Sequence, residues 1–302
     1  MQRRYITADV FTERVFSGNP LAVVLDAQGL STSQMQSIAT EFNYAETTFV
    51  LPPQSGAHTA HVRIFTSRVE VPFAGHPTIG TAVMLAQESE AGEHPAVSQY
   101  IFEMAGGDIA VQLLRERGLV VGAELRAPEP LSLRDTVSVE RTAACLSLSR
   151  DDVSIAAHPP QVISVGLPFL VAELKTRDAL RRARPVLALH EEVLPTVGTD
   201  SIYAYVRGPE AGSLHARAFM PIDGMVEDAA TGSATAATIA LLASLGAEPS
   251  SDLSWRVEQG VDMGRPSVLL GRTRKRDGTV TDVHIAGKAV RVMRGVLALP
   301  PL

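Results

Sequence analysis

Two stretches of the chain combine ionisable side chains with a glycine-bearing turn, and both stand directly before a long apolar segment. The first, residues 72–80, reads PFAGHPTIG and carries His76. The second, residues 227–234, reads EDAATGSA and carries Asp228 and Ser233. If the apolar segments are helices, both turns lie at helix N-termini, where free N–H groups and the positive dipole end bind anions. Two such turns would suit a small carboxylate.

Each of these side chains also has a purely structural explanation. His76 could be a turn or capping residue, or it could hydrogen-bond a substrate hydroxyl or hold a proton near neutral pH. Asp228 could cap the second helix, or orient a partner such as a substrate amine or His76. Ser233 could be a small first-turn residue, or could donate to a substrate carboxylate together with the N–H groups of Gly232 and Ser233.

The apolar segments are expected to be buried helices that position these turns. Residues 78–87 and 231–245 are apolar almost all round, and a helix of that kind must be buried on every side. The second segment contains Thr and Ser and is shorter than the ~18 residues of a membrane span. We therefore expect one central helix in each half of the chain.

Similar landmarks recur in the two halves. The run GNPLAVVL at residues 18–25 resembles GLPFLVAEL at residues 166–174. Thr78 opens the first apolar segment as Thr231 opens the second. Landmarks in the same order, about half a chain length apart, indicate two domains of like topology.

An amphipathic helix is expected between these landmarks in each half. The first covers residues 31–43, where Ser31 and Gln34 are spaced as a capping box. The second covers roughly residues 178–193 and is interrupted at Pro185.

Short alternating runs predict strands throughout the chain. The predicted strands are residues 4–11, 22–26, 47–51, 61–65, 99–104, 108–114, 161–165, 169–174, 201–206, 214–219, 254–258, 267–271 and 280–285. Many strands with one long helix in each half predict an α+β fold, in which a curved, mixed sheet wraps around a central helix, twice, with a cleft between the domains. The domains are expected at residues 1–122 and 123–302, and the last strand could return to the first domain.

Composition excludes several classes of function. The 302 residues are 45% hydrophobic and carry a net charge of −6, which suits two globular domains. Basic residues cluster only in short patches, so neither nucleic acid nor an anionic membrane is the expected partner. The N-terminus lacks an apolar run of signal-peptide length, which favours the cytoplasm.

Metal and nucleotide cofactors are not expected either. The single cysteine, Cys145, lies in an amphipathic helical stretch and is predicted to be a buried thiol, so no multi-cysteine metal site can form. His58 and His61 have helical spacing but lie in a strand-like run, and further metal ligands would be needed. No dinucleotide glycine motif or phosphate-binding loop is present.

Five blocks of the sequence, in order, resemble the PhzF-like family of phenazine biosynthesis. They read ADVFTERVFSGNPLAVVLDAQGLS, EFNYAETTFVLPP, EVPFAGHPTIGTA, EDAATGSA and EQGVDMGRPS, and they run from about Ala8 to Ser267. The resemblance implies the diaminopimelate-epimerase-like fold, with two similar domains and the active site between them. The family's best-known members are homodimers that isomerise trans-2,3-dihydro-3-hydroxyanthranilate without a cofactor.

The resemblance also implies roles for individual residues. Glu46, in AETTFV, falls on the family's catalytic acid/base, and His76, Asp228 and Ser233 fall on other active-site positions. We accordingly predict Glu46, His76 and Asp228 as catalytic. The predicted substrate-binding residues are Gly75, Gly232 and Ser233. Ala229 departs from the family, where proline is usual, and so does the pair Ser67 and Arg68, where Thr-Pro is common.

Glu46 has the surroundings that such a role would need. Proton transfer at carbon requires a group that takes a proton and returns it elsewhere, ideally with a raised pKa. Glu46 stands among apolar and β-branched residues, where desolvation would raise the pKa of its carboxyl toward neutrality. From its position alone, a strand-edge glutamate facing water is the favoured explanation, and the resemblance reverses that preference.

Related racemases of this fold use two cysteines, one at each helix N-terminus. The corresponding turns here hold Gly75-His76 and Gly232-Ser233, so neither offers a thiolate. A two-cysteine racemase is therefore excluded.

The leading expectation is a cofactor-independent isomerase that shifts a proton on a small cyclic or unsaturated carboxylate. One alternative is a hydrolase or lyase that uses Ser233 with His76 and Asp228 as a triad, although the nucleophile-elbow context is missing. The other alternative is a non-catalytic protein that binds small carboxylates. The fold alone does not choose among these functions.

Overall fold

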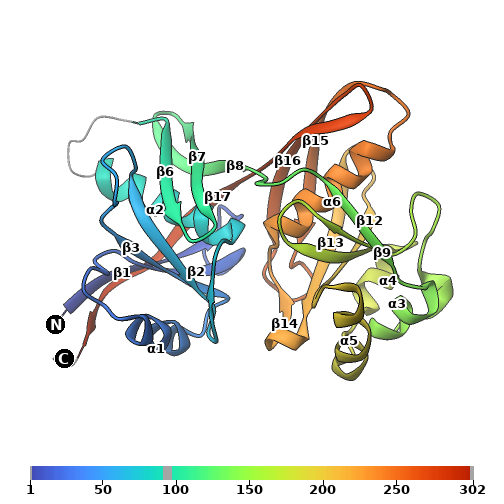
Figure 1. Ribbon diagram of the computed structural model, residues 1–302, viewed down its shortest axis with the longest axis horizontal. Coiled ribbons are helices and arrows are strands. Elements are labelled where there is room, and N and C mark those ends of the chain that lie inside the picture. The colour runs from blue at the N-terminus through green and yellow to red at the C-terminus, as the bar shows by residue number, and fades with distance from the viewer. Residues whose placement is uncertain (1, 91–96, 300–302) are drawn as a thin grey trace. The chain divides into compact units, whose positions relative to one another are not determined.

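The computed structural model describes residues 2–90 and 97–299 (Figure 1). Contacts within the chain divide it into two units. The first comprises the residues up to Leu125 together with those from Ala286 onward, and the second comprises Arg126–Ile285. The predicted boundary after residue 122 lies inside a strand, β8 (Leu119–Arg126).

The fold is mixed α and β and consists mostly of strands. The first unit contains β1 (Gln2–Val10), β2 (Asn19–Val24), α1 (Thr32–Phe42), β3 (Glu46–Leu51), β4 (Ala60–Phe65), β5 (Glu70–Val71), α2 (Gly75–Glu90), β6 (Gln99–Met104), β7 (Gly107–Glu116) and β8. The second contains β9 (Ser132–Thr136), α3 (Val139–Cys145), β10 (Gln161–Ser164), β11 (Pro168–Glu173), α4 (Arg177–Arg182), α5 (Leu187–Val193), β12 (Ile202–Arg207), β13 (Ser213–Met220), β14 (Met225–Asp228), α6 (Gly232–Leu245), β15 (Ser251–Gln259) and β16 (Ser267–Arg276). Short 3-10 turns cover Arg150–Asp152, Pro195–Val197 and Pro221–Asp223. The last strand, β17 (Thr279–Ala298), begins in the second unit and ends in the first.

The sheet of the first unit closes on itself. Around the ring β1 pairs with β2, β2 with β3, β3 with β4, β4 with β6, β6 with β7, β7 with β8, β8 with β17 and β17 with β1. The pairs β2–β3 and β4–β6 are parallel. The closed sheet of eight strands is therefore barrel-like and leaves none of these strands with an open edge.

Helix α2 packs against this sheet as its apolar sequence requires. It contacts β1, β2, β3 and β7, and almost every residue of its first ten is buried. A Cβ atom added at Gly80 would lie 2.5 Å from the Leu21 side chain and 2.6 Å from that of Val10. The glycine thus lets the helix approach the strands closely. Figure 1 shows α2 behind strands β6 and β7.

Helix α1 covers a different apolar surface of the first unit. Its buried residues Met35, Ile38 and Ala39 join a hydrophobic cluster with Phe49 and Phe65. The helix begins with the predicted capping box. The side chain of Ser31 accepts from the Gln34 N–H at 3.2 Å, and the Gln34 side chain accepts from the Ser31 N–H at 2.9 Å.

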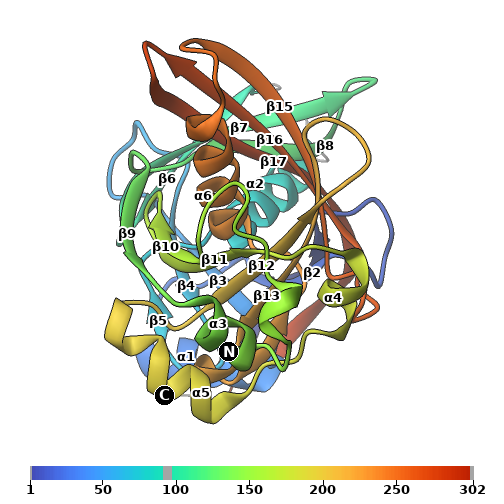
Figure 2. The ribbon, with the colours of Figure 1, turned by 90° about the vertical axis from the view of Figure 1, so that its right-hand side faces the viewer.

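The second unit uses the same order of pairings. Strands β10–β11, β12–β13 and β15–β16 are antiparallel, whereas β11–β12 and β13–β15 are parallel. Helix α6 contacts β10, β11, β15 and β16, and its residues 234–243 are buried (Figure 2). The helical region expected at residues 178–193 is two helices, α4 and α5, which end and begin on either side of Pro185.

A short motif also occurs once in each unit. His-x-Arg-x-Phe stands at residues 61–65 in β4 and at residues 215–219 in β13. Arg63 forms two hydrogen bonds with Glu70 of the neighbouring strand β5, at 2.7 and 2.6 Å. In the second unit the corresponding arginine, Arg217, pairs in the same way with Glu227 of β14 at 2.8 and 2.6 Å.

The structure corrects how the two helices correspond. Helix α2 begins at Gly75 rather than at Thr78, because a proline such as Pro77 is tolerated in a first turn, where its missing N–H has no helical partner. Helix α6 begins at Gly232, and Thr231 is its N-cap. Measured from the helix starts, His76 therefore corresponds to Ser233.

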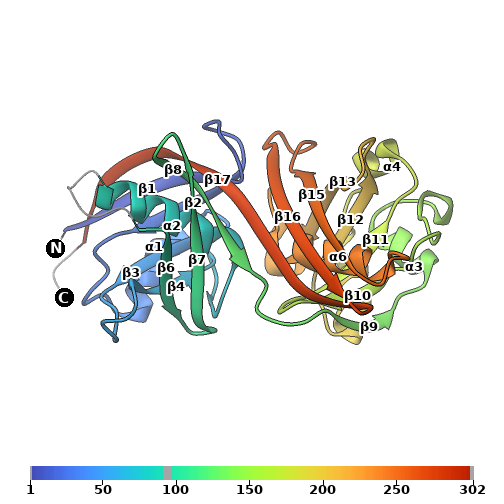
Figure 3. The same ribbon diagram turned by 90° about the horizontal axis from the view of Figure 1, so that it is seen from above.

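Four strands and the extension of a fifth were not predicted. They are β5, β8, β9, β14 and the part of β17 beyond Ile285, of which Figure 3 labels β8, β9 and β17. The extension lacks an apolar alternation because Lys288 pairs with Glu13 and Glu116, while Arg291 and Arg294 both pair with Glu88. Charged residues interrupt the alternation of apolar and polar residues by which a strand is predicted, so this part of β17 was not recognised. Among the described residues, no helix has both the length and the apolar character to cross a membrane.

The contact between β8 and β17 leaves no room for a side chain at Gly122. A Cβ atom there would lie 2.4 Å from the Gly287 carbonyl oxygen and 3.1 Å from the Lys288 Cα. We predict that Gly122→Ala lowers the free energy of unfolding by about 1–3 kcal/mol, because backbone must shift to admit the methyl group. Urea denaturation would measure the loss.

Gly56→Ala is the matched control, since a Cβ atom at Gly56 meets nothing within 4 Å. Equal stability of the two variants would contradict the close contact between β8 and β17.

Candidate active site

The first unit brings together two of the predicted catalytic side chains. Glu46 is the first residue of β3, and His76 is the second residue of α2. The Glu46 Oε2 and His76 Nδ1 atoms are 3.4 Å apart, and the side chains are 16% and 5% exposed. The Asn19 amide nitrogen lies 3.3 Å from the same imidazole nitrogen. A carboxyl group and an imidazole thus meet at the start of a buried helix.

Tight backbone turns place Asn19 beside the imidazole. Gly18 has φ +66°, and a Cβ atom there would lie 2.3 Å from the Val10 carbonyl oxygen. Only glycine fits a left-handed position at such a short distance from the preceding strand. The Gly-Asn-Pro sequence at residues 18–20 therefore has two roles. It begins strand β2, and it places Asn19 beside the imidazole of His76.

His76 is a neutral imidazole at neutral pH. Burial lowers the pKa of His76 to about 3, an effect that the nearby Pro20 backbone offsets only in part. The contact with Glu46 is therefore not a pair of opposite charges. The expectation that His76 holds a proton near neutral pH is wrong, because the desolvated site disfavours the imidazolium ion. Its other predicted role, a hydrogen bond to a substrate hydroxyl, remains open to a neutral ring.

In the second unit, Asp228 ends β14 and lies in a buried turn before α6. The residue is 6% exposed, and its Oδ2 accepts a hydrogen bond from the Thr231 hydroxyl at 2.6 Å. Thr231, not Asp228, occupies the N-cap position of the helix. The structural alternative in which Asp228 caps α6 is therefore wrong.

No chemical role was predicted for Gln259, which the structure places directly against this turn. Its side chain is fully buried and bonds both Asp228 and Thr231. The next residue, Gly260, has φ +73°, and a Cβ atom there would lie 2.6 Å from the Ala229 carbonyl oxygen. The only signal in the sequence was that Gln259 lies in one of the five family-like blocks.

The predicted substrate-binding residues all lie at helix starts. Gly75 is the first residue of α2, while Gly232 and Ser233 are the first two of α6. In α6 the first helical hydrogen bond runs from the Thr235 N–H to the Thr231 carbonyl at 3.0 Å. The earlier amides have no partner within the helix, so they are donors suited to a carboxylate.

The only cysteine belongs to neither of these turns. Cys145 lies buried at the end of α3, as predicted, and burial raises the pKa of its thiol to about 11. No thiolate is therefore available for a cysteine-based racemase. In residues 2–90 and 97–299, no group of three or more His, Cys, Asp and Glu side chains is arranged to hold a metal ion.

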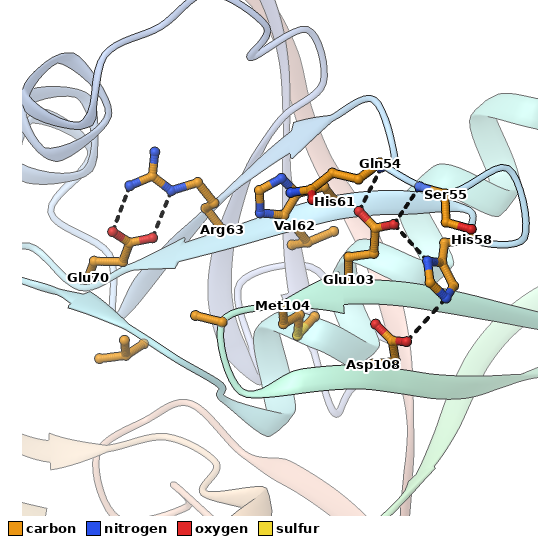
Figure 4. A pocket seen from close by; sticks show the side chains of 12 residues that line it. Gln54, Ser55, His58, His61, Val62, Arg63, Glu70, Glu103, Met104 and Asp108 are labelled. Atoms are coloured by element: carbon orange, nitrogen blue, oxygen red, sulfur yellow. Dashed lines mark hydrogen bonds and ion pairs between the residues drawn. The ribbon is translucent and has the colours of Figure 1, made fainter.

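A separate cavity of about 620 Å³ lies in the first unit, and neither Glu46 nor His76 lines it (Figure 4). Its charged groups pair with one another. His58 lies between two carboxylates, with Nδ1 2.6 Å from Glu103 and Nε2 3.2 Å from Asp108. Because its charges are already matched, we do not assign the reaction to this cavity.

Sequence comparisons show the family to which the chain is similar. The PhzC-PhzF family model, described as phenazine biosynthesis-like protein, matches residues 8–295. An uncharacterized isomerase from Mesorhizobium japonicum is 36% identical over 98% of both chains. A trans-2,3-dihydro-3-hydroxyanthranilate isomerase from Pseudomonas chlororaphis is 35% identical over 98% of this chain and 99% of its own.

Solved structures extend the similarity to the fold. A PhzF-family protein from Bacillus anthracis superposes with a TM-score of 0.88 at 26% identity, covering 99% of this chain and 100% of the other. A hydroxyproline epimerase from Agrobacterium vitis has a TM-score of 0.69 at 11% identity, covering 99% and 93%. The fold is thus also that of proline racemases and epimerases.

We predict that His76 stays unprotonated under mildly acidic conditions. Because burial depresses its pKa below the usual value of about 6.5, its contribution to stability is present above that pH and is lost as the pH falls toward 3. NMR of ¹⁵N-histidine-labelled protein would follow the ring, and a His76→Asn variant would identify its signals. Titration of those signals near pH 6.5 would contradict the assignment.

The opposite behaviour is expected for His58. Carboxylate oxygens only accept hydrogen bonds, so a ring between two carboxylates carries protons on both nitrogens. Its pKa is raised, first by the hydrogen bond to Glu103 and also by Asp108. The stabilisation is therefore complete below about pH 6.5 and declines as the pH rises through the folded-state pKa. Urea denaturation of wild type and His58→Gln across this range should show a gap that narrows with rising pH, and a constant gap would refute the charge.

Proposed function

The chain belongs to the PhzC-PhzF family of phenazine biosynthesis-like proteins and is an isomerase, and we propose that it shifts a proton on a small cyclic or unsaturated carboxylate without a cofactor. Glu46 is the general acid and base of this reaction. The observation that carries the proposal is the contact of Glu46 with a neutral imidazole, 3.4 Å away at the start of a buried helix.

The neutrality of His76 favours Glu46 as a base. A cation at this distance would stabilise the carboxylate and weaken its tendency to take a proton from carbon. A neutral imidazole has no such effect. Its Nδ1 faces Glu46 and Asn19, so its Nε2 is the nitrogen that can hydrogen-bond a substrate hydroxyl. His76 therefore orients the substrate and leaves the proton transfer to Glu46.

The reaction conserves atoms and electrons without a further reactant. The Glu46 carboxylate removes a proton from a ring carbon, and the electron pair of that C–H bond moves into the conjugated system. The protonated carboxyl then returns the proton to a different carbon, which forms a new C–H bond and restores the carboxylate. A group that takes up one proton and delivers one needs no cofactor, and while the carboxyl is protonated its proton exchanges with water, so the product carries solvent hydrogen.

The residues at the start of α6 bind the substrate in this proposal. Gly232 and Ser233 supply amide donors, and the Ser233 hydroxyl supplies another, for the substrate carboxylate. Gly75 does the same at α2, and Asp228 orients a substrate amine. The substrate resembles trans-2,3-dihydro-3-hydroxyanthranilate, on which relatives that are about 35% identical are named to act.

We also propose that the two units are similar domains and that the protein forms a homodimer. The two units are epimerase-like domains of one plan, each with a curved sheet around its long helix, and the recurring order of strand pairings supports this. The chain is a homodimer, for which sedimentation equilibrium would give the mass.

The hydrolase alternative receives less support. Ser233 is the second residue of a regular helix and is not among the residues with positive φ, whereas a nucleophile elbow is a strained strand-to-helix turn. A non-catalytic binding protein would bind carboxylates without any exchange of protons.

We predict that Glu46→Gln abolishes proton transfer and leaves the fold intact. The amide cannot accept a proton from carbon, so exchange should fall by at least ~100-fold, a typical contribution of a general base. Mass spectrometry would follow deuterium uptake from D₂O into dihydro-hydroxyanthranilate and a panel of unsaturated amino and hydroxy acids.

Glu41→Gln is the matched control, because Glu41 is exposed on α1 only five residues away. It should exchange like the wild type. Undiminished exchange in Glu46→Gln would overturn the proposal. Loss of turnover only in Ser233→Ala would favour the hydrolase, and binding without exchange in every protein would favour the non-catalytic alternative.

A further inference from the structure

The buried amide of Gln259 is held in one orientation. The Thr231 N–H donates to its Oε1 at 3.1 Å, and its Nε2 donates to the Asp228 carbonyl oxygen at 2.9 Å. A backbone N–H only donates and a carbonyl only accepts, so these two contacts fix which end of the amide is which. The second Nε2 hydrogen is directed at the Thr231 hydroxyl oxygen, also at 2.9 Å.

This orientation determines where the Thr231 hydroxyl proton points. The Thr231 oxygen accepts from Gln259, so its own hydrogen is free to donate, and the Asp228 Oδ2 atom lies 2.6 Å away. The result is a directed chain of hydrogen bonds from Gln259 through Thr231 to the Asp228 carboxylate. A chain of this kind holds the carboxylate in place and strengthens each of its bonds.

The same hydrogen bonds keep the Thr231 hydroxyl from capping helix α6. A threonine at an N-cap normally accepts from an N–H of the first turn, as Ser31 does in α1. Thr231 occupies the N-cap of α6 but makes no side-chain capping bond. The first-turn amides of α6, including that of Ser233, therefore do not have this intramolecular partner.

We propose that Gln259 is a positioning residue for substrate binding. By donating to Thr231, it turns the threonine hydroxyl toward Asp228, which fixes that carboxylate and keeps the start of α6 uncapped for the carboxylate of the substrate. This role rests on the proposed function of Asp228 and Ser233. A glutamine that only filled the space behind the turn would not orient the Thr231 hydroxyl in this way.

Removing the donor should impair binding more than it impairs the fold. In Gln259→Met the Thr231 hydroxyl is released to cap α6, so both the amides and the Asp228 carboxylate lose their arrangement. We expect kcat/KM to fall by about 10- to 100-fold, the usual effect of displacing a binding group by a fraction of an ångström to an ångström. Gln161→Met is the matched control, because Gln161 in the same unit also donates to a backbone carbonyl, that of Arg134.

A second variant distinguishes positioning from stability. In Gln259→Glu the ionised carboxylate cannot donate to Thr231, but the protonated acid can. Because the position is fully buried, the pKa of this carboxyl should lie above its usual value of about 4.3, so activity of the variant relative to the wild type should rise as the pH is lowered from about 9 to about 5. A purely structural role would change the unfolding midpoint without producing this relative rise.

Thr231→Val tests the chain itself. If Gln259 acts through Thr231, the double variant Gln259→Met with Thr231→Val should lose no more activity than either single variant. Full additivity of the two losses would overturn the proposal. Wild-type kinetics in a folded Gln259→Met variant, or a Gln259→Glu profile parallel to the wild type, would overturn it as well.

A measurement of ligand affinity tests the role of Gln259 independently of the proposed reaction. Isothermal titration with anthranilate, an aromatic amino-carboxylate without a transferable ring proton, should show weaker binding to Gln259→Met and unchanged binding to Gln161→Met. If Glu46→Gln still exchanges deuterium while the Gln259 variants bind weakly, the reaction is wrong and the positioning role stands. Unchanged anthranilate binding by Gln259→Met would refute the positioning role whatever the result for Glu46.

Discussion

The burial of two apolar helices is the constraint on which the other features depend. Neither α2 nor α6 has a polar face to give to water, so each must be covered by strands along its length. At the first turn, however, a helix has amides without internal partners. The most polar backbone of the helix therefore lies in a desolvated setting, and the candidate residues His76 and Ser233 stand at those turns.

Desolvation has different consequences for the polar groups around these turns. His76 responds by remaining neutral, because the nearby Pro20 backbone offsets only part of the cost of charging it. Gln259 carries no charge and instead uses every hydrogen-bonding atom of its amide. Arg217 remains a buried cation, held by Glu227 and by the carbonyl oxygens of Leu180 and Ala183. Of these three groups, two are neutral and the third is matched by a carboxylate.

Much of this fold could be predicted from patterns among neighbouring residues. Features that depend on contacts between residues distant in the sequence could not. The capping box of α1, the break at Pro185 and the strands with apolar alternation follow from neighbouring residues, and they were found. The extension of β17 depends on ion pairs with residues such as Glu88 and Glu116, distant in the sequence, so no local pattern revealed it. The repeated His-x-Arg-x-Phe motif was visible in the sequence and would have matched the two halves better than Thr78 and Thr231. The neutrality of His76 and the orientation of Gln259 arise from tertiary packing, which the sequence does not state.

The closed sheet of the first unit has a consequence for how the chain is made. The ring is completed only when β17 pairs with β1 and β8, and β17 ends at Ala298, near the C-terminus of the chain. During synthesis the ribosome releases the second unit before it releases the part of that strand that belongs to the first unit, residues 286–298. Until β17 has been synthesised, the strands of the first unit therefore form only an incomplete barrel, in which the edges of β1 and β8 are unpaired. The second unit, which is continuous in sequence, is free to fold ahead of the unit that precedes it.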